Sequence, residues 1–171
     1  MPVQQQTSQQ YFKGLYILHI AFIIGLFVFS IIAAFLVITG AMGQDKNNMN
    51  SILQFLVPVL VIGGIIGGLG FYRSRLNVIK QTPELKDKLG NYRGAMILRV
   101  AMMEFPALFS IIAFLLTGNY LFLGLAGLVI IIFLMLIPSK ERVSNDLELS
   151  TQERSIISDP NAIVAEVETK Q

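Results

Sequence analysis

The sequence predicts an all-α membrane protein, built as a four-transmembrane-helix bundle with a small cytoplasmic C-terminal tail. Of its 171 residues, 54% are hydrophobic and only 14% are charged. The hydrophobic residues fall into four mostly apolar runs of at least about 18 residues, close to the length that an α-helix needs to cross a bilayer. We therefore expect transmembrane spans at residues 15–39, 52–72, 95–117 and 120–137.

The chain begins with a polar segment. Residues 1–10 are rich in glutamine and nearly uncharged, so we expect a disordered lead-in to the transmembrane domain, residues 11–138. The run at 15–39 is longer than the apolar core of a signal peptide, so it predicts a retained helix. It contains His19, the only histidine. This side chain could donate a hydrogen bond to a backbone carbonyl of a neighbouring helix, or it could meet Glu104 at a similar depth.

The second run, 52–72, is rich in glycine. It contains two overlapping GxxxG pairs, formed by Gly63, Gly64, Gly67 and Gly68. Glycines four residues apart lie on one face of a helix and let a second membrane helix approach closely. We expect this helix to pack directly against the run at 95–117, because a short connection joins the two.

The connection between the second and third runs is basic. Two acids are outnumbered by six cations, which are Arg73, Arg75, Lys80, Lys86, Lys88 and Arg93. Lysine and arginine gather on the cytoplasmic side of membrane proteins, so we expect this connection and both termini in the cytoplasm, with the chain in a bacterial inner membrane. Of the thirteen Lys and Arg residues, only Lys46 then lies outside. Orientation alone could explain the charge, or the cations could bind an anionic lipid or an acidic partner.

A short surface helix is also expected in this connection. Thr82 offers a capping hydroxyl, and Pro83 would occupy the first helical position. Gly90 is typical of a helix end. We expect this helix at about residues 83–89, separate from the third span.

The third run, 95–117, carries an ionisable residue near its middle. At 1.5 Å per residue, Glu104 lies about 14 Å along the helix from Ala95, close to the centre of a ~30 Å hydrocarbon core. A charged group there costs roughly 2.5–3.5 kcal/mol and usually faces other helices or water. We therefore expect Glu104 to be buried in the bundle as the candidate ion-binding residue, with His19 and Arg99 as candidate modulators.

The residues around Glu104 belong to the same helix. Pro106 removes a backbone N–H and predicts a kink. Ala101 and Ala107 share the Glu104 face and would let a neighbouring helix approach closely. Arg99 lies about 140° round the helix from Glu104, so we expect its side chain to extend to the cytoplasmic interface. An Arg99 from a second copy could instead pair with Glu104.

Four motifs follow one another within residues 63–119. They are the glycine run at 63–70, Lys80-Gln81-Thr82-Pro83, Arg93-Gly94 and Met103-Glu104. In this order they resemble the two-helix proteolipid, subunit c, of F-type ATP synthases. The resemblance implies that Glu104 corresponds to the ion-carrying carboxylate of that family. The chain departs from the pattern in having Lys80 where the family has arginine, an inserted Thr82, and Arg99 within the second helix.

The fourth run, 120–137, follows a turn at Gly118-Asn119 that we expect outside the membrane. Pro138 ends this run, because proline cannot continue a helix.

Residues 139–171 form the soluble tail, which carries seven acids and four bases. Ser150 and Glu153 fit a capping box, which predicts a short helix near 151–158. A segment at 140–149 could also be helical. The acidic tail could touch the basic connection, or both sets of charges could remain solvated.

The sequence supports two functional hypotheses from different classes. The first is a structural or assembly protein, which packs through its glycine-rich helices and recruits a partner. The second is a proton- or cation-handling membrane module that uses Glu104, as the subunit c resemblance implies. The expected partners are the lipid bilayer and either further copies of the chain or other membrane subunits.

The sequence gives no support for an enzyme. It contains no HExxH, no GxSxG and no phosphate-binding loop, and a single histidine cannot build a histidine-rich metal site. The absence of cysteine excludes disulfides and thiolate metal sites. We expect no metal, no cofactor and no nucleic acid.

Overall fold

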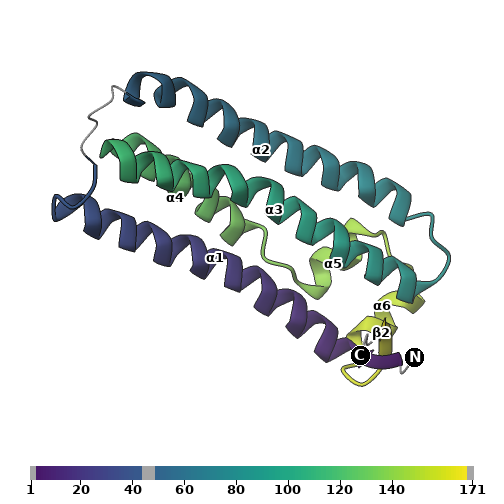
Figure 1. Ribbon diagram of the computed structural model, residues 1–171. Coiled ribbons are helices and arrows are strands. Elements are labelled where there is room, and N and C mark those ends of the chain that lie inside the picture. The colour runs from purple at the N-terminus through teal and green to yellow at the C-terminus, as the bar shows by residue number, and fades with distance from the viewer. Residues whose placement is uncertain (1–2, 44–48, 169–171) are drawn as a thin grey trace.

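The computed structural model describes residues 3–43 and 49–168. Four helices run side by side as one bundle, and shorter elements gather at one end of it (Figure 1). The bundle helices are α1 Ser8–Ile38, α2 Met49–Ile79, α3 Leu85–Thr117 and α4 Tyr120–Met135. The shorter elements are the helices α5 Lys140–Asp146 and α6 Thr151–Ser158 and the strands β1 Val3–Thr7 and β2 Ile163–Glu168.

Three of these helices, α1, α2 and α3, are long and apolar enough to cross a membrane. Helix α4 has 16 residues, fewer than the roughly 20 that a straight crossing needs. Only α4 and α5 together are long and apolar enough to cross a membrane, and the two helices meet at a bend of 88°. The predicted all-α bundle is thus confirmed, with three helices that can span a membrane and a fourth only as a bent pair.

Helix α3 starts earlier than the third span was expected to start. It runs without a break from Leu85, so the prediction of a separate helix at 83–89 is wrong. Leu89 and Tyr92 lie one turn apart, and both are fully buried among residues of the tail. Burying these two large side chains outweighs the roughly 1 kcal/mol that a glycine such as Gly90 costs inside a helix.

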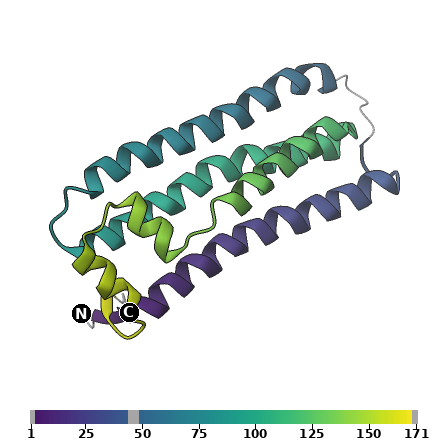
Figure 2. The same ribbon diagram turned by 180° about the vertical axis from the view of Figure 1, so that it is seen from behind.

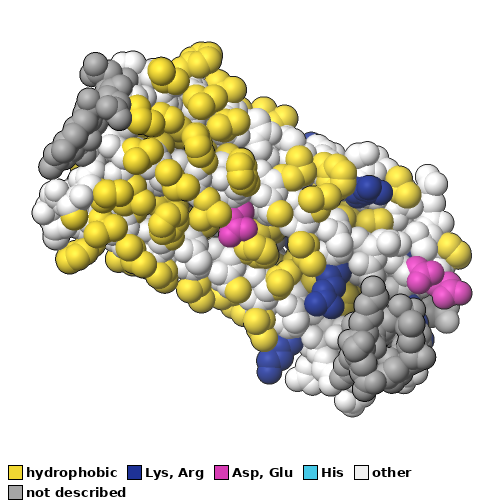
Figure 3. Space-filling model, viewed as in Figure 1, with side chains coloured by type: hydrophobic (Ala, Val, Ile, Leu, Met, Phe, Trp, Pro, Cys, Tyr) yellow, Lys and Arg dark blue, Asp and Glu magenta, His cyan; other side chains and the backbone are white. Residues whose placement is uncertain are grey.

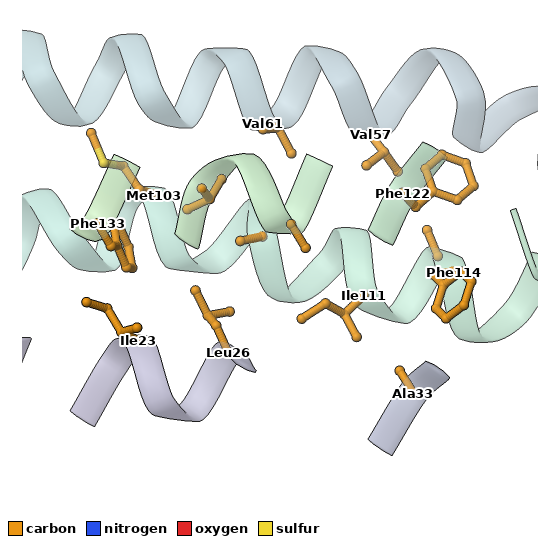
Figure 4. Packing of buried hydrophobic residues seen from close by; sticks show 14 of the residues in the cluster. Ile23, Leu26, Ala33, Val57, Val61, Met103, Ile111, Phe114, Phe122 and Phe133 are labelled. Atoms are coloured by element: carbon orange, nitrogen blue, oxygen red, sulfur yellow. The ribbon is translucent and has the colours of Figure 1, made fainter. Parts of the chain in front are cut away.

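The main core is apolar and is centred on α3, which packs against α1, α2 and α4. Figure 4 shows side chains of all four helices meeting there, including Leu26, Val61, Ile111 and Phe122. Helix α3 has more buried residues than any other helix, because it has neighbours on three sides. The other bundle helices bury one stripe and leave large apolar side chains exposed.

The two ends of the chain together close one end of the bundle. Strand β1 pairs antiparallel with β2, with Gln5 opposite Glu166. The Ser8 hydroxyl donates to the Ile157 carbonyl at 2.5 Å. The prediction of a disordered lead-in at residues 1–10 is therefore wrong for residues 3–10, and residues 1–2 lie outside the described part. The backbone of this polar segment is ordered because β2 supplies its hydrogen-bond partners.

The tail is folded against the bundle. Helix α6 coincides with the predicted helix at 151–158, and its capping box is formed by Ser150 and Glu153. Helix α5 falls within the segment at 140–149. Strand β2 was not predicted, and residues 169–171 lie outside the described part. Figure 2 shows α5, α6 and β2 at the same end as the connection between α2 and α3.

Candidate functional site

Helices α2 and α3 approach closely at two glycines. A Cβ built on Gly64 would lie 2.5 Å from Cγ of Pro106 and 2.8 Å from the Met102 carbonyl oxygen. A Cβ on Gly68 would lie 3.1 Å from the Arg99 carbonyl oxygen. Because a side chain at Gly64 would overlap atoms of α3, this helix separation requires small residues. The predicted packing of the glycine-rich helix against the third span is confirmed for this GxxxG pair.

The other GxxxG pair contributes less. A Cβ on Gly67 would touch only Cε of Met102, at 3.4 Å, and a Cβ on Gly63 would meet nothing within 4 Å. The packing role predicted for Gly63 is therefore wrong. Neighbouring residues on a helix differ by about 100° in direction, so only one of two overlapping pairs can face α3 fully.

On α3, the contact with Gly64 is made by larger residues than expected. The facing atoms belong to Met102 and to the buried ring of Pro106. Ala107 lies in the main core, and Ala101 is half-buried. Helix α3 continues through Pro106, and the kink expected there stays a prediction.

Glu104 lies on the outer flank of α3. Its side chain is half-buried, and the next residue, Phe105, is 71% exposed. Among the described residues, Glu104 has no hydrogen-bond or ion-pair partner. Figure 3 shows an acidic side chain in the middle of the hydrophobic surface of the bundle. The expectation that Glu104 is buried in the bundle is therefore wrong, because the other helices of the chain leave this flank open.

Arg99, one helical turn and a half before Glu104, is buried. It is 3% exposed, and its Cζ atom lies 3.9 Å from the centre of the Tyr72 ring of α2. Its Nε and Nη2 atoms have no hydrogen-bond partner in the described part of the chain. The prediction that Arg99 extends to the aqueous interface is wrong, since a desolvated cation–π contact, worth about 2 kcal/mol, holds it inside. A buried Arg99 is also out of reach of Glu104 from a second copy.

Two tyrosines connect this buried cation to α5. The Tyr72 hydroxyl donates to Oδ2 of Asp146 at 2.7 Å, and the Tyr92 hydroxyl donates to the same oxygen at 3.3 Å. The two rings meet edge to face, with centroids 6.0 Å apart. Neither the two tyrosines nor Asp146 was predicted from the sequence as a functional residue. The signal that could have found the tyrosines is their position near the ends of apolar runs, where tyrosine anchors membrane helices.

His19 connects α1 to α4. It is fully buried, and its Nε2 lies 2.8 Å from the Phe133 carbonyl oxygen. Because a carbonyl can only accept, Nε2 carries the proton. Nδ1 has no partner among the described residues. The reading of His19 as a donor to a neighbouring backbone is confirmed, and no described contact joins it to Glu104.

The acidic tail binds the basic connection through ion pairs. The Lys88 ammonium lies 2.7 Å from Glu153, and the Lys80 ammonium lies 2.6 Å from Glu148. Burial opposes ionisation of Glu153, but hydrogen bonds from Lys88 and Ser150 outweigh it and hold the pKa of Glu153 below its usual range. Two of the six cations that could bind lipid are therefore paired with acids of the tail.

The described residues contain no group of three or more His, Cys, Asp or Glu side chains that could hold a metal ion. No protein-family model, no curated protein and no solved structure matches the chain.

Proposed function

We propose that this chain is a membrane assembly subunit, which associates with a second copy of itself through the flank of α3 that carries Glu104. The observation that carries the proposal is that Glu104 has no hydrogen-bond or ion-pair partner among the described residues. A carboxyl group at this depth costs roughly 2.5–3.5 kcal/mol if it stays charged in lipid. A neighbouring subunit that covers the flank would remove most of that cost.

The chemistry of the flank suits a second copy. Two Glu104 carboxyls that meet across a two-fold axis can share a proton, because a protonated carboxyl donates and the other accepts. The surrounding surface is apolar, with Phe105 and Ile112 of α3 exposed by 71% and 43%. Polar groups on membrane helices usually face another helix rather than lipid, and hydrogen bonds between such groups join membrane helices.

The proposal includes four membrane crossings, with both termini in the cytoplasm. Strands β1 and β2 pair with each other, so both ends of the described chain belong on one side of the membrane. An even number of crossings follows, and α4 with its bend into α5 would supply the fourth. The basic connection between α2 and α3 lies at the same end of the bundle, which the positive-inside rule assigns to the cytoplasm.

A chain without cysteine allows a direct test by disulfide cross-linking in membranes. Phe105→Cys places a thiol beside Glu104, and Ile131→Cys places one on α4, where the native side chain is 57% exposed. We expect covalent dimers from the first variant and few from the second. Adding Glu104→Gln to the Phe105→Cys chain should keep the dimer, because glutamine can still hydrogen-bond, whereas Glu104→Leu should reduce it. Equal cross-linking at both positions, or no effect of Glu104→Leu, would refute the proposal.

Ion handling through Glu104 remains a second candidate function. It is supported by the lack of a fixed partner, which leaves the carboxyl able to exchange a proton, and by the resemblance to subunit c. Neither the groove between α2 and α3 nor the groove between α1 and α4 is lined by Glu104, so an ion path would need a neighbouring subunit. In this case Glu104→Gln should abolish proton or cation flux into vesicles while cross-linking through Phe105→Cys persists.

A further inference from the structure

A groove of about 320 Å³ runs between α2 and α3 near the basic end of the bundle. Its polar lining includes Arg75, Thr82 and Asn91, and its apolar lining includes Phe71 and Leu98. We propose that this groove binds one anionic phospholipid, with the lipid phosphate on Arg75 and an acyl chain along the apolar part.

The lining changes from apolar to polar along α3, and Arg75 and Thr82 supply polar groups on the facing side. Along α3 it passes from Leu98 to Asn91 towards the connection. On the facing side, Phe71 precedes Arg75 on α2, Val78 and Ile79 follow, and Thr82 lies just beyond the end of α2. The apolar part faces the membrane-spanning segments, and the polar part faces the connection between the helices. A phospholipid at the membrane surface has this same order of chemical groups. A free phosphate ion would use only the polar part.

Two glycines keep the groove open. Gly90 and Gly94 both line it, and they lie four residues apart on one face of α3. A Cβ built on either residue would meet nothing within 4 Å. The described residues therefore leave the space in front of both glycines empty, and it is available to a ligand.

Arg75 is the cation that remains available in this groove. Lys80 and Lys88 are paired with acids of the tail. Arg75 is exposed, its Cζ lies 5.1 Å from the centre of the Phe71 ring, and it has no ion pair with any described residue. A guanidinium group held against an aromatic ring presents a planar fork of donors that matches phosphate oxygens.

The nearby acids lie in a separate groove. Glu84 and Asp87 line a hollow that shares Gly90 and Asn91 with the lipid groove, and neither acid lines the lipid groove itself. They lie before and within the first turn of α3, on the aqueous side, where they do not meet the phosphate proposed on Arg75.

The test is a titration of the detergent-solubilised, delipidated protein with phosphatidylglycerol, followed by native mass spectrometry. Phosphatidylcholine and inorganic phosphate are titrated in parallel. We expect one tightly bound phosphatidylglycerol, and weaker binding of the other two. Arg75→Gln should weaken binding roughly 10- to 100-fold. Arg73→Gln removes the same charge two residues earlier on α2, at a position that does not line the groove, and should weaken binding by about fivefold or less.

A second pair of variants tests the groove without changing charge. Gly94→Leu fills the groove and should abolish the bound lipid. Gly70→Leu adds the same side chain on α2 at a position that does not line the groove and should leave binding intact. Circular dichroism checks that all variants are folded. Equal effects of Arg73→Gln and Arg75→Gln, lipid binding that survives Gly94→Leu, equal binding of phosphatidylcholine, or inorganic phosphate binding as tightly would each overturn the proposal.

Discussion

Replacing Gly64 with alanine tests whether the close approach of α2 and α3 stabilises the bundle. The added methyl carbon would lie 2.5 Å from Cγ of Pro106, and an ordinary contact begins at 3.4 Å, so the helices must separate locally by about 0.9 Å. Neither facing atom can turn away. The proline ring is closed, and the Met102 oxygen, 2.8 Å from the methyl, belongs to the backbone.

The expected magnitude follows from this overlap. A gap of roughly 0.5–1 Å loses a quarter to a half of the dispersion attraction of each affected contact. Forcing an extra methyl group into a packed site costs about 1–3 kcal/mol. Alanine returns up to about 1 kcal/mol, because it is a better helix former than glycine. We expect Gly64→Ala to lower the free energy of unfolding by about 1–2 kcal/mol.

Gly63→Ala is the matched control. It makes the same chemical change one residue earlier, where the new methyl group would meet nothing within 4 Å. This variant should be unchanged or up to about 1 kcal/mol more stable. Reversible unfolding in mixed micelles with rising dodecyl sulfate, followed by far-UV circular dichroism, measures both variants. If both shift the midpoint equally, the glycine contact does not set the stability of the bundle.

Three further predictions concern the folded tail and the membrane topology. Tyr72→Phe removes a hydrogen bond to the Asp146 carboxylate and should lower the free energy of unfolding by about 1.5 kcal/mol, and a thermal melt identical to the native one would contradict this. Folding lowers the pKa of Glu153 from its unfolded value of 4.5. The ionised carboxylate therefore stabilises the fold above pH 4.5, and this stabilisation is lost as the pH falls through the lower pKa of the folded state. The melting temperature should therefore drop less in Lys88→Met than in the native chain on acidification. Topology reporters inserted at Lys46 and at the C-terminus should give opposite signals, and the same signal would exclude four crossings.

The sequence by itself determined the features that depend on local physics. Apolar runs place the three helices that are long and apolar enough to cross a membrane, since length and hydrophobicity are properties of one segment. The capping box of Ser150 and Glu153 fixes the start of α6, because its hydrogen bonds join residues three apart. Gly118 makes the turn before α4 with a φ of 70°, a value that favours glycine.

Pairing between distant segments was decided only by the tertiary structure. The polar start of the chain forms a strand because β2, near the other end of the chain, pairs with it. Helix α3 extends back to Leu85 because the tail buries Leu89 and Tyr92. Arg99 stays inside because α2 brings the Tyr72 ring beneath it. Each outcome depends on a partner that local composition does not reveal.

For Glu104, the position along the helix follows from the sequence, whereas the direction of the side chain follows from the tertiary structure. Its depth follows from the sequence, because each helical residue adds 1.5 Å along the axis. The direction of its side chain depends on the rotation of α3, which is set by the contact of Met102 and Pro106 with Gly64. That contact leaves Glu104 on the outer flank. Side-chain direction could not be derived from the spacing of residues, because it depends on which face of the helix gains most by packing.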